Sequence, residues 1–238
     1  MLRRTAENVG RSRLRALLRP AEKRFYDCQV SPQRPAELGF DHRFIPARDE
    51  ARKPLLLLHG TGGDENDLLP LGARLAPGAA LLSPRGKILE NGSPRFFRRL
   101  REGEWDIPDF RQRTSELAGF VERARKAYRL APPIAVGFSN GANAAWSLLL
   151  HKPDLLSGAI LMRAMMPFDP RPLPDLEGVP VLILAGAIDQ MVPTEQAGLL
   201  AAYLGEAGAD ATYDVLPAGH NLTERDLVLA SGWLSKHG

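Results

Sequence analysis

The feature that most constrains this chain is a short apolar run that ends in Gly-x-Ser-x-Gly and passes directly into a helical pattern. The apolar run covers residues 134–138, and residues 142–150 have a composition typical of a helix. A serine between a strand and a helix takes a strained backbone conformation, and side chains two positions to either side would collide. Gly137 and Gly141 remove these side chains. The pattern therefore predicts a sharp turn that presents the hydroxyl of Ser139 near the positive end of the following helix.

Apolar runs alternate with helical patterns along most of the chain. Buried strands are expected at residues 55–58, 79–82, 134–138, 157–162, 179–186 and 211–216, and helices at 65–76, 109–129, 142–150, 193–207 and 222–236. Continuous apolar runs are typical of strands that are covered on both faces. The alternation predicts an α/β fold with a mostly parallel central sheet and helices on both faces. Two earlier segments, residues 25–30 and 40–45, are expected to be antiparallel entry strands.

Charge and length divide the chain into two unequal parts. The 238 residues and 44% hydrophobic content fit one globular domain. Residues 1–25 contain eight basic and two acidic side chains, whereas residues 26–238 contain 23 basic and 26 acidic ones. We expect a basic, flexible N-terminal extension at residues 1–22, with an amphipathic surface helix as the alternative, and a single domain at residues 23–238. The domain gives no reason to expect a nucleic-acid partner.

Signals that would direct the chain to a membrane or out of the cell are not apparent. Arg13, Arg15 and Arg19 interrupt the leucines of the basic segment, so no secretory signal is expected. No run approaches the roughly 20 apolar residues of a membrane span. The single cysteine, Cys28, excludes an intramolecular disulfide and a multi-cysteine metal site. We expect a cytoplasmic protein without integral membrane association, and the sequence leaves a homodimer open.

Three polar residues, of the types that serve as nucleophile, orienting acid and base, each follow an expected strand. A serine hydroxyl is a weak nucleophile near neutral pH and requires an adjacent base, which a carboxylate orients. In open α/β sheets such groups gather beyond the carboxyl ends of the strands. Ser139, Asp189 and His220 all meet this condition. His59 also follows a strand, but a glycine-rich loop comes directly after it. We therefore predict Ser139 as nucleophile, His220 as base and Asp189 as orienting acid.

The glycine-rich loop after residue 58 is expected to bind the oxyanion of an acyl-transfer reaction. Glycines at positions 60, 62 and 63 would let the backbone approach a substrate closely. We predict that the backbone N–H groups of Thr61 and Asn140 are the oxyanion donors. A glycine turn without a catalytic part is the alternative.

Residues 84–108 are expected to form a long irregular section, which in a compact domain is usually functional or disordered. Aromatic residues there, and two methionines after another strand, are candidates for a substrate pocket, with packing in the core as the alternative. These candidates are Phe96, Phe97, Trp105, Met165 and Met166. Basic residues crowd the same section and acidic residues follow them, which favours a solvated ion-pair network over an anion site. No metal-ligand set is apparent, so no metal and no cofactor are expected.

Four stretches resemble the signature blocks of the phospholipase/carboxylesterase family of the α/β-hydrolase superfamily, which includes acyl-protein thioesterases. They are residues 57–65, 83–86, 137–142 and 217–220, and residues 83–99 are most similar to a bacterial carboxylesterase branch. The resemblance extends from about residue 40 onward. It implies an α/β-hydrolase fold without a large cap domain, the triad Ser139, Asp189 and His220, and oxyanion donors at Thr61 and Asn140.

The activity that the resemblance implies is hydrolysis of carboxylic esters, EC 3.1.1, through an acyl-enzyme. The expected substrates are small molecules with small or medium acyl or aryl groups. Asn140 stands where the thioesterase branch often carries glutamine, which weakens a transfer of protein-thioester substrates to this chain. Two alternatives stay open. One is a thioesterase or lysophospholipase acting on longer acyl chains, and the other is a binding protein with the same fold and no catalysis.

Overall fold

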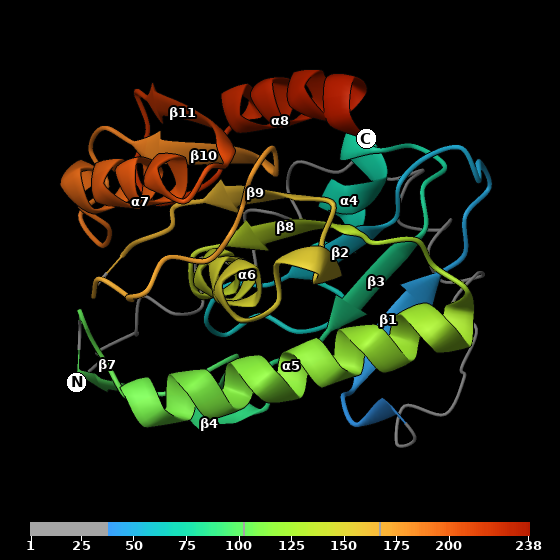
Figure 1. Ribbon diagram of the computed structural model, residues 1–238, viewed down its shortest axis with the longest axis horizontal. Helices are drawn as coiled ribbons and strands as arrows, with labels where there is room; N and C mark the ends of the chain where they lie inside the picture. The colour runs from blue at the N-terminus through green and yellow to red at the C-terminus, as the bar shows by residue number, and fades with distance from the viewer. Residues whose placement is uncertain (1–37, 102, 167) are drawn as a thin grey trace, which may run out of the picture.

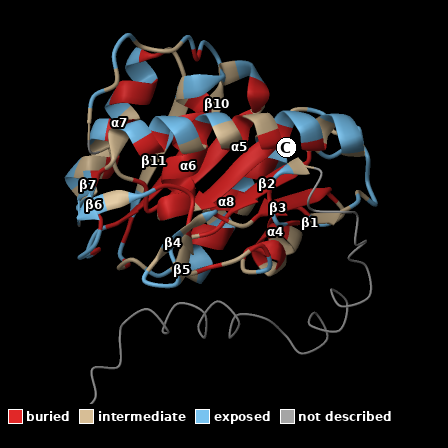
Figure 2. Ribbon diagram, turned by 90° about the horizontal axis from the view of Figure 1, so that it is seen from below, coloured by how far each residue is buried: buried red, intermediate tan, exposed pale blue. Residues whose placement is uncertain are grey.

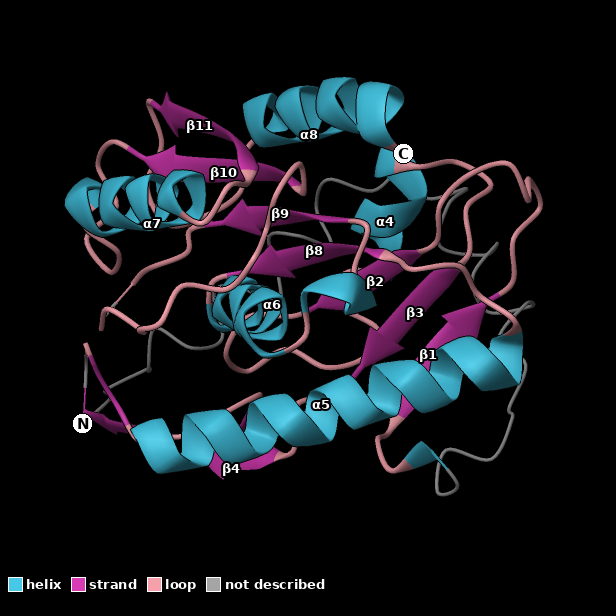
Figure 3. Cartoon of the chain, in the orientation of Figure 1, coloured by secondary structure: helices cyan, strands magenta, loops and turns pink. Residues whose placement is uncertain are grey.

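A seven-stranded sheet runs through the middle of the protein (Figures 1 and 3). The computed structural model describes residues 38–101, 103–166 and 168–238, so the expected extension at residues 1–22 and strand at residues 25–30 lie outside the described residues. The strands of the sheet are β1 (His42–Ile45), β2 (Leu55–Leu58), β3 (Leu81–Pro84), β8 (Ile134–Phe138), β9 (Gly158–Met162), β10 (Pro180–Gly186) and β11 (Asp210–Leu216). Their spatial order is β1-β3-β2-β8-β9-β10-β11.

The sheet is parallel except at one edge. β1 pairs with β3 in the antiparallel direction, and every other pair in the sheet is parallel. This confirms the predicted mostly parallel sheet and the antiparallel entry strand. Because parallel strands present their carboxyl ends at the same edge, the segments that follow β2, β8, β9, β10 and β11 emerge close to one another.

Helices cover both faces of the sheet, as predicted. They are α4 (Leu69–Leu75), α5 (Ile107–Tyr128), α6 (Asn140–His151), α7 (Thr194–Glu206) and α8 (Glu224–His237), with a short 3₁₀ turn, η3, at Pro153–Leu155. In β2, Leu56 and Leu58 belong to the core beneath α5, α6 and α7, whereas Leu55 and Leu57 belong to the core beneath α4 and α8. The buried strands accordingly lie between two helical layers (Figure 2). Alternate residues of each strand thus face two separate apolar cores.

The starts of the helices differ from the expected positions by one to four residues, and for α4 and α5 the local cause is visible. α4 begins at Leu69 rather than at residue 65, because the Asp64 carboxylate accepts a hydrogen bond from the Asn66 backbone N–H and holds the preceding residues in a turn. α5 begins two residues early, at Ile107. Asp106 caps it by accepting from the Asp109 backbone N–H at 3.1 Å.

Residues 84–108 are not irregular, which corrects the sequence-based expectation. They form two small antiparallel ribbons, β4 (Ile88–Glu90) with β5 (Ser93–Arg95), and β6 (Arg99–Arg101) with β7 (Glu104–Trp105). The turn between β4 and β5 is Asn91-Gly92, with φ of 51° and 82°. Asn-Gly with two positive φ angles is the preferred two-residue hairpin turn, so this signal was present in the sequence.

The described chain contains no separate cap domain over the strand ends; the two ribbons and α5 fill the connection between β3 and β8. None of the described helices combines the length and the apolar composition that crossing a bilayer requires. The expected division into an extension and a single domain, with residue 23 as the boundary, stays a prediction.

Candidate active site

The turn between β8 and α6 has the strained geometry that its glycines predict. Ser139 has φ of 53° and ψ of −117°, although it is not a glycine. A Cβ atom on Gly137 would lie 2.4 Å from the Gly141 carbonyl oxygen, and one on Gly141 would lie 2.0 Å from the Leu58 carbonyl oxygen. No side chain fits at either position, since both obstacles are backbone atoms. The turn therefore requires both glycines.

Three side chains from three strand ends meet beside this turn. The Nε2 atom of His220 lies 3.0 Å from the Ser139 Oγ, and the Nδ1 atom lies 2.8 Å from the Asp189 Oδ2. The other Asp189 oxygen accepts hydrogen bonds from the backbone N–H groups of Met191 and Val192, at 2.8 and 3.0 Å. The structure thus brings together the serine, histidine and aspartate that the sequence singled out, although they lie 81 and 31 positions apart in the chain.

The carboxylate of Asp189 is kept ionised by its partners. Burial alone would raise the pKa of Asp189, but hydrogen bonds from His220 and from the backbone N–H groups of Val192 and Met191 outweigh burial and lower it. The side chain of Asp189 is fully inaccessible, whereas 18% of the His220 side chain is exposed. An ionised carboxylate at this place holds Nδ1 of His220 protonated and leaves Nε2 free to accept a proton from a hydroxyl.

The two backbone N–H groups that the sequence predicts as oxyanion donors lie in the loop after β2 and directly after Ser139. In the loop after β2, the Gly62 N–H donates to the Pro94 carbonyl at 3.0 Å and the Gly63 N–H donates to the Gly60 carbonyl at 3.1 Å. Among the described residues, the N–H groups of Thr61 and Asn140 donate to no protein acceptor. Thr61 and Asn140 are the residues that the sequence predicts as oxyanion donors, and this role stays a prediction.

His59 holds the loop after β2 in place. Its Nε2 atom accepts a hydrogen bond from the Gly86 backbone N–H at 2.9 Å, so its Nδ1 atom carries the proton and donates to the Gly60 carbonyl at 2.7 Å. Burial lowers the pKa of His59 from 6.5 to about 4. A neutral imidazole therefore connects the glycine-rich loop to the segment that precedes β4. Sequence reasoning set His59 aside as a base but did not find this contact.

The candidate pocket residues divide into a buried and a half-buried group. Phe96, Phe97 and Trp105 are at most 6% exposed and belong to the core beneath α5 and α6. The ring centres of Phe97 and Trp105 are 4.6 Å apart. Met165 and Met166 are half-buried, pack against the same core and follow the end of β9 by three and four residues. The Met165 backbone N–H donates to Asn143 Oδ1 of α6 at 3.0 Å. Contact of any of these five side chains with a substrate stays a prediction.

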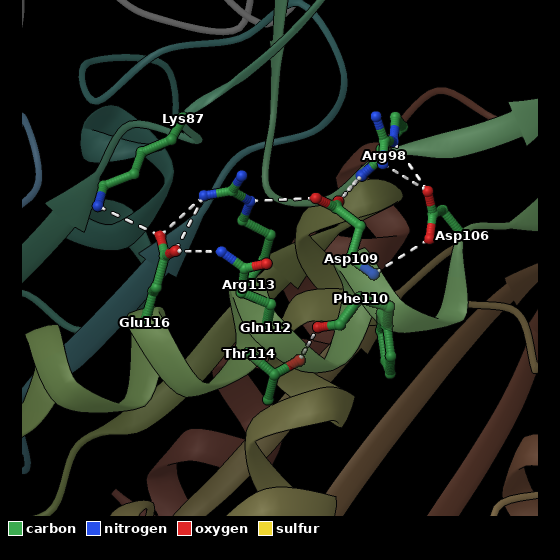
Figure 4. A network of polar contacts seen from close by, with 9 residues as sticks. All are labelled: Lys87, Arg98, Asp106, Asp109, Phe110, Gln112, Arg113, Thr114 and Glu116. Atoms are coloured by element: carbon green, nitrogen blue, oxygen red, sulfur yellow. Dashed lines mark hydrogen bonds and ion pairs between the residues drawn. The ribbon is translucent and has the colours of Figure 1, made fainter.

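The basic residues of the ribbons are paired with acids, as the sequence predicts. Figure 4 shows the part of this network that joins the ribbons to the first turns of α5. Asp109 accepts from the Arg98 backbone N–H at 2.6 Å and from Arg113 Nε at 3.2 Å, and Glu116 binds both Arg113 and Lys87. Elsewhere in the ribbons, Glu90 binds Arg95 and Arg99. These contacts account for the excess of arginine without an anionic ligand.

Sequence reasoning missed two residues that lie beside His220. Arg163, directly after β9, and Asp226, in the first turn of α8, form an ion pair with Nη1 and Oδ1 2.7 Å apart, and both side chains are fully inaccessible. The signal was an arginine at the end of a strongly apolar strand, together with Thr223 three residues before Asp226 in the pattern of a capping box.

In the described residues, no cluster of three or more histidine, cysteine, aspartate or glutamate side chains is arranged to hold a metal ion.

Similarity to individual known proteins, rather than to a family model, shows the family of this chain. No family model matches the chain. MhqD of Bacillus subtilis (strain 168), which is provisionally named a hydrolase, is 48% identical over 181 residues, covering 75% of this chain and 90% of MhqD. The crystal structure of the Bacillus cereus carboxylesterase is 41% identical, with a TM-score of 0.83 over 85% of this chain and 97% of that protein.

The chain belongs to the bacterial carboxylesterase branch of the α/β hydrolases. The carboxylesterase from Mesorhizobium loti agrees, with 34% identity and a TM-score of 0.78 over 82% of this chain and 94% of that one. The present protein is accordingly an esterase-type hydrolase with the α/β-hydrolase fold. The resemblance drawn from the four sequence blocks is thereby confirmed.

Proposed function

We propose that this hydrolase cleaves carboxylic esters of small or medium acyl or aryl groups through a covalent acyl-enzyme on Ser139. The observation that carries the proposal is the continuous contact from the Ser139 Oγ through the His220 imidazole to the Asp189 carboxylate, at 3.0 and 2.8 Å. The first distance is within the range that proton transfer from a serine to a histidine requires, and the second is within hydrogen-bond range for a carboxylate that orients the imidazole. The strained backbone of Ser139, which projects its side chain at the strand edge, supports the same role.

In the proposed reaction, the Ser139 Oγ attacks the ester carbonyl carbon while His220 Nε2 takes the hydroxyl proton. Asp189 keeps the imidazole oriented and stabilises its positive charge. The carbonyl oxygen becomes an oxyanion, and the unpaired N–H groups of Thr61 and Asn140 stabilise it. His220 then gives its proton to the leaving alcohol. Water, deprotonated by His220, hydrolyses the acyl-enzyme and regenerates the serine.

Apolar residues support an acyl or aryl substrate over a charged one. Met165 and Met166 are partly exposed apolar side chains that follow β9, the strand paired with the one that ends before Ser139, and methionine adapts its shape to varied apolar groups. The ribbon arginines are already paired with carboxylates, so they are poorly placed to attract an anionic substrate. The alternative substrates are thioesters, in which a carbon–sulfur bond is cleaved, and lysophospholipids, both with longer acyl chains. The experiment below varies the acyl length.

The test is hydrolysis of p-nitrophenyl esters from acetate to palmitate by the wild-type protein and by Ser139→Ala. We expect turnover of short and medium chains, and a loss of roughly 10⁴- to 10⁶-fold in the variant. Ser235→Ala, which removes an exposed hydroxyl on α8, is the matched control and should keep full activity. Activity of Ser139→Ala within about tenfold of wild type would refute the assignment. A preference for long chains would favour the lysophospholipase or thioesterase alternative. No turnover and no labelling by a fluorophosphonate would favour a binding protein.

A further inference from the structure

The segment that carries His220 has no regular secondary structure to hold it. It runs from residue 217 to residue 223, between the end of β11 and the first turn of α8. Its carbonyl groups therefore need partners outside a helix or strand ladder. The Ala218 carbonyl accepts from the Ile188 backbone N–H at 3.2 Å, which ties the segment to the loop that carries Asp189. The carbonyls on either side of His220 have a different partner.

That partner is the guanidinium of Arg163. Its Nε atom donates to the Gly219 carbonyl at 2.9 Å, and its Nη2 atom donates to the Asn221 carbonyl at 3.2 Å. One side chain thus binds the carbonyl groups of the residues immediately before and after the histidine. Since the planar guanidinium is rigid, these two bonds fix the separation and direction of the two carbonyls together.

The remaining donors of Arg163 hold the guanidinium itself in place. Nη1 donates to the Leu184 carbonyl of β10 at 3.2 Å and to Asp226 Oδ1 at 2.7 Å, and Nη2 donates to Asp226 Oδ2 at 3.0 Å. All five N–H donors of the guanidinium therefore have an acceptor. Asp226 Oδ2 also accepts from the backbone N–H and the hydroxyl of Thr223, both at 2.8 Å. The guanidinium is thus anchored to β10 and to the first turn of α8.

The backbone of Arg163 is also unusual. Its φ is 59°, in the left-handed region that residues with a side chain rarely adopt. Such a conformation persists where the surrounding contacts determine it, and it is frequent beside functional sites. Arg163 follows β9 directly and is 1% exposed, so it touches no solvent and lies outside the reach of a substrate.

We propose that Arg163 is a positioning residue for His220, which sets the imidazole against Ser139 and Asp189 by binding the carbonyls on both sides of it. The proposal rests on the function proposed above, in which His220 is the base. Arg163 takes no part in the chemistry. Its loss lets the segment at residues 217–223 move, and displacing a catalytic group by about 1 Å costs on the order of 10²-fold in rate.

Two variants test the proposal without leaving a buried charge alone. Arg163→Lys keeps a cation opposite Asp226, but a single ammonium group cannot reproduce the fork that binds both carbonyls. The double variant Arg163→Met, Asp226→Asn removes both charges, and the amide oxygen introduced by the second substitution can still accept from Thr223. We expect both variants to fold, and kcat for a p-nitrophenyl ester to fall roughly 10- to 100-fold with KM nearly unchanged.

Two further readouts separate positioning from a general loss of stability. The rate at which a fluorophosphonate labels Ser139 should fall in parallel with kcat. The far-downfield proton resonance of His220 Nδ1, which reports its hydrogen bond to Asp189, should broaden or shift. Val121→Ala in α5 is the control, because it removes buried apolar atoms from a residue that is fully inaccessible and has no contact with residues 217–223. This control should lower the thermal midpoint and change neither readout.

Wild-type kcat, labelling rate and His220 resonance in Arg163→Lys would overturn the proposal. The proposal would also be overturned if Val121→Ala lost as much kcat and labelling rate as the Arg163 variants for the same fall in thermal midpoint. The resonance also keeps this inference separate from the proposed function. A wild-type protein that hydrolyses no ester, yet whose His220 resonance depends on Arg163, would refute the esterase function and leave the positioning role supported.

Discussion

The serine turn and the two ribbons lie next to one another, yet different forces hold them. The turn joins β8 to α6, in which residues 140–149 are all buried, and close backbone contacts at Gly137 and Gly141 leave it one conformation. The ribbons, residues 85–101 and 103–106, are largely accessible outside their aromatic side chains. A hydrogen bond from the Arg98 backbone N–H to Asp109 and the ion pair of Lys87 with Glu116 join them to α5. The comparison shows that the serine turn is determined sterically at short range, whereas polar contacts between segments distant in the chain attach the ribbons to α5.

This difference determines how each region responds to substitution. Close-packed backbone cannot relax around an added atom, so a single methyl group is costly in the turn. Partly exposed ion pairs contribute little individually, because water and salt screen them. The turn should therefore tolerate almost no change, whereas the ribbons should tolerate most changes at single charges.

The largest effect is expected from Gly141→Ala. The new Cβ would lie 2.0 Å from the Leu58 carbonyl oxygen and 2.5 Å from that of His59, so the loop after β2 would have to move. We expect a loss of about 3 kcal/mol in the free energy of unfolding and roughly 10²-fold or more in ester hydrolysis. Gly232→Ala is the matched control, since nothing lies within 4 Å of its Cβ position in α8. That variant should be as stable as wild type or slightly more stable. Equal behaviour of the two would contradict the steric account.

The second prediction concerns His59, which connects the loop after β2 to the ribbon segment. The pKa of His59 is lowered from 6.5 to about 4, so the unfolded chain binds the proton more readily between these pH values. Stability should therefore fall as the pH drops from about 6.5 to 4, by up to about 3 kcal/mol. Carboxylates with a lowered pKa, such as Glu65, lose their contribution mainly below about pH 4.5, their ordinary value.

Urea unfolding between pH 7.5 and 4 checks this prediction. His59→Gln should be less stable at neutral pH and should show a flatter dependence on pH over the same window. His151→Gln, at the exposed end of α6, is the control and should reproduce the wild-type curve. A wild-type stability that stays constant from pH 6.5 to 4.5 would mean that His59 is protonated without cost.

The third prediction tests the attachment of the ribbons to α5. Asp109 is 8% exposed and accepts from the Arg98 backbone N–H, so Asp109→Ala leaves that donor without a partner. We expect a loss of about 1–3 kcal/mol in urea unfolding. Asp109→Asn keeps an acceptor of the same size and should lose less. Ester hydrolysis by folded Asp109→Ala should stay within a few-fold of wild type. A loss of ester hydrolysis as large as that of Gly141→Ala would show that the ribbons affect the candidate site more strongly than the comparison implies.

The smallest effect is expected from Lys87→Met. Lys87 Nζ lies 3.4 Å from Glu116 Oε2, and both side chains are about a third exposed. Removing the charge should change the free energy of unfolding by about 0.5 kcal/mol, and the change should shrink in 1 M salt. Thermal unfolding at low and high salt measures both quantities. A change above about 1.5 kcal/mol that persists in 1 M salt would contradict the description of the ribbon charges as weak and screened.

Local patterns predicted the individual strands and the serine turn well because each depends on residues that are neighbours in the chain. The apolar run at residues 55–58 became β2, and the glycines around Ser139 were required for the reasons that their spacing indicates. The ribbons were missed even though Asn91-Gly92 is a strong hairpin signal. Their short, charged strands lack the apolar alternation that identifies a strand. Pairing within each ribbon and polar contacts with α5 stabilise them instead.

The sequence alone determined the strand order along the chain, the need for glycine at two positions and the identity of the three residues that follow strands. These features depend on local sterics and on the common direction of parallel strands. Only the tertiary structure decided which side chains hold these residues in place. His59 and Arg163 act on groups 27 and 56 positions away, Gly86 and Gly219, through single hydrogen bonds. No local pattern encodes such contacts, because they arise only when packing excludes water and each buried donor must find an acceptor.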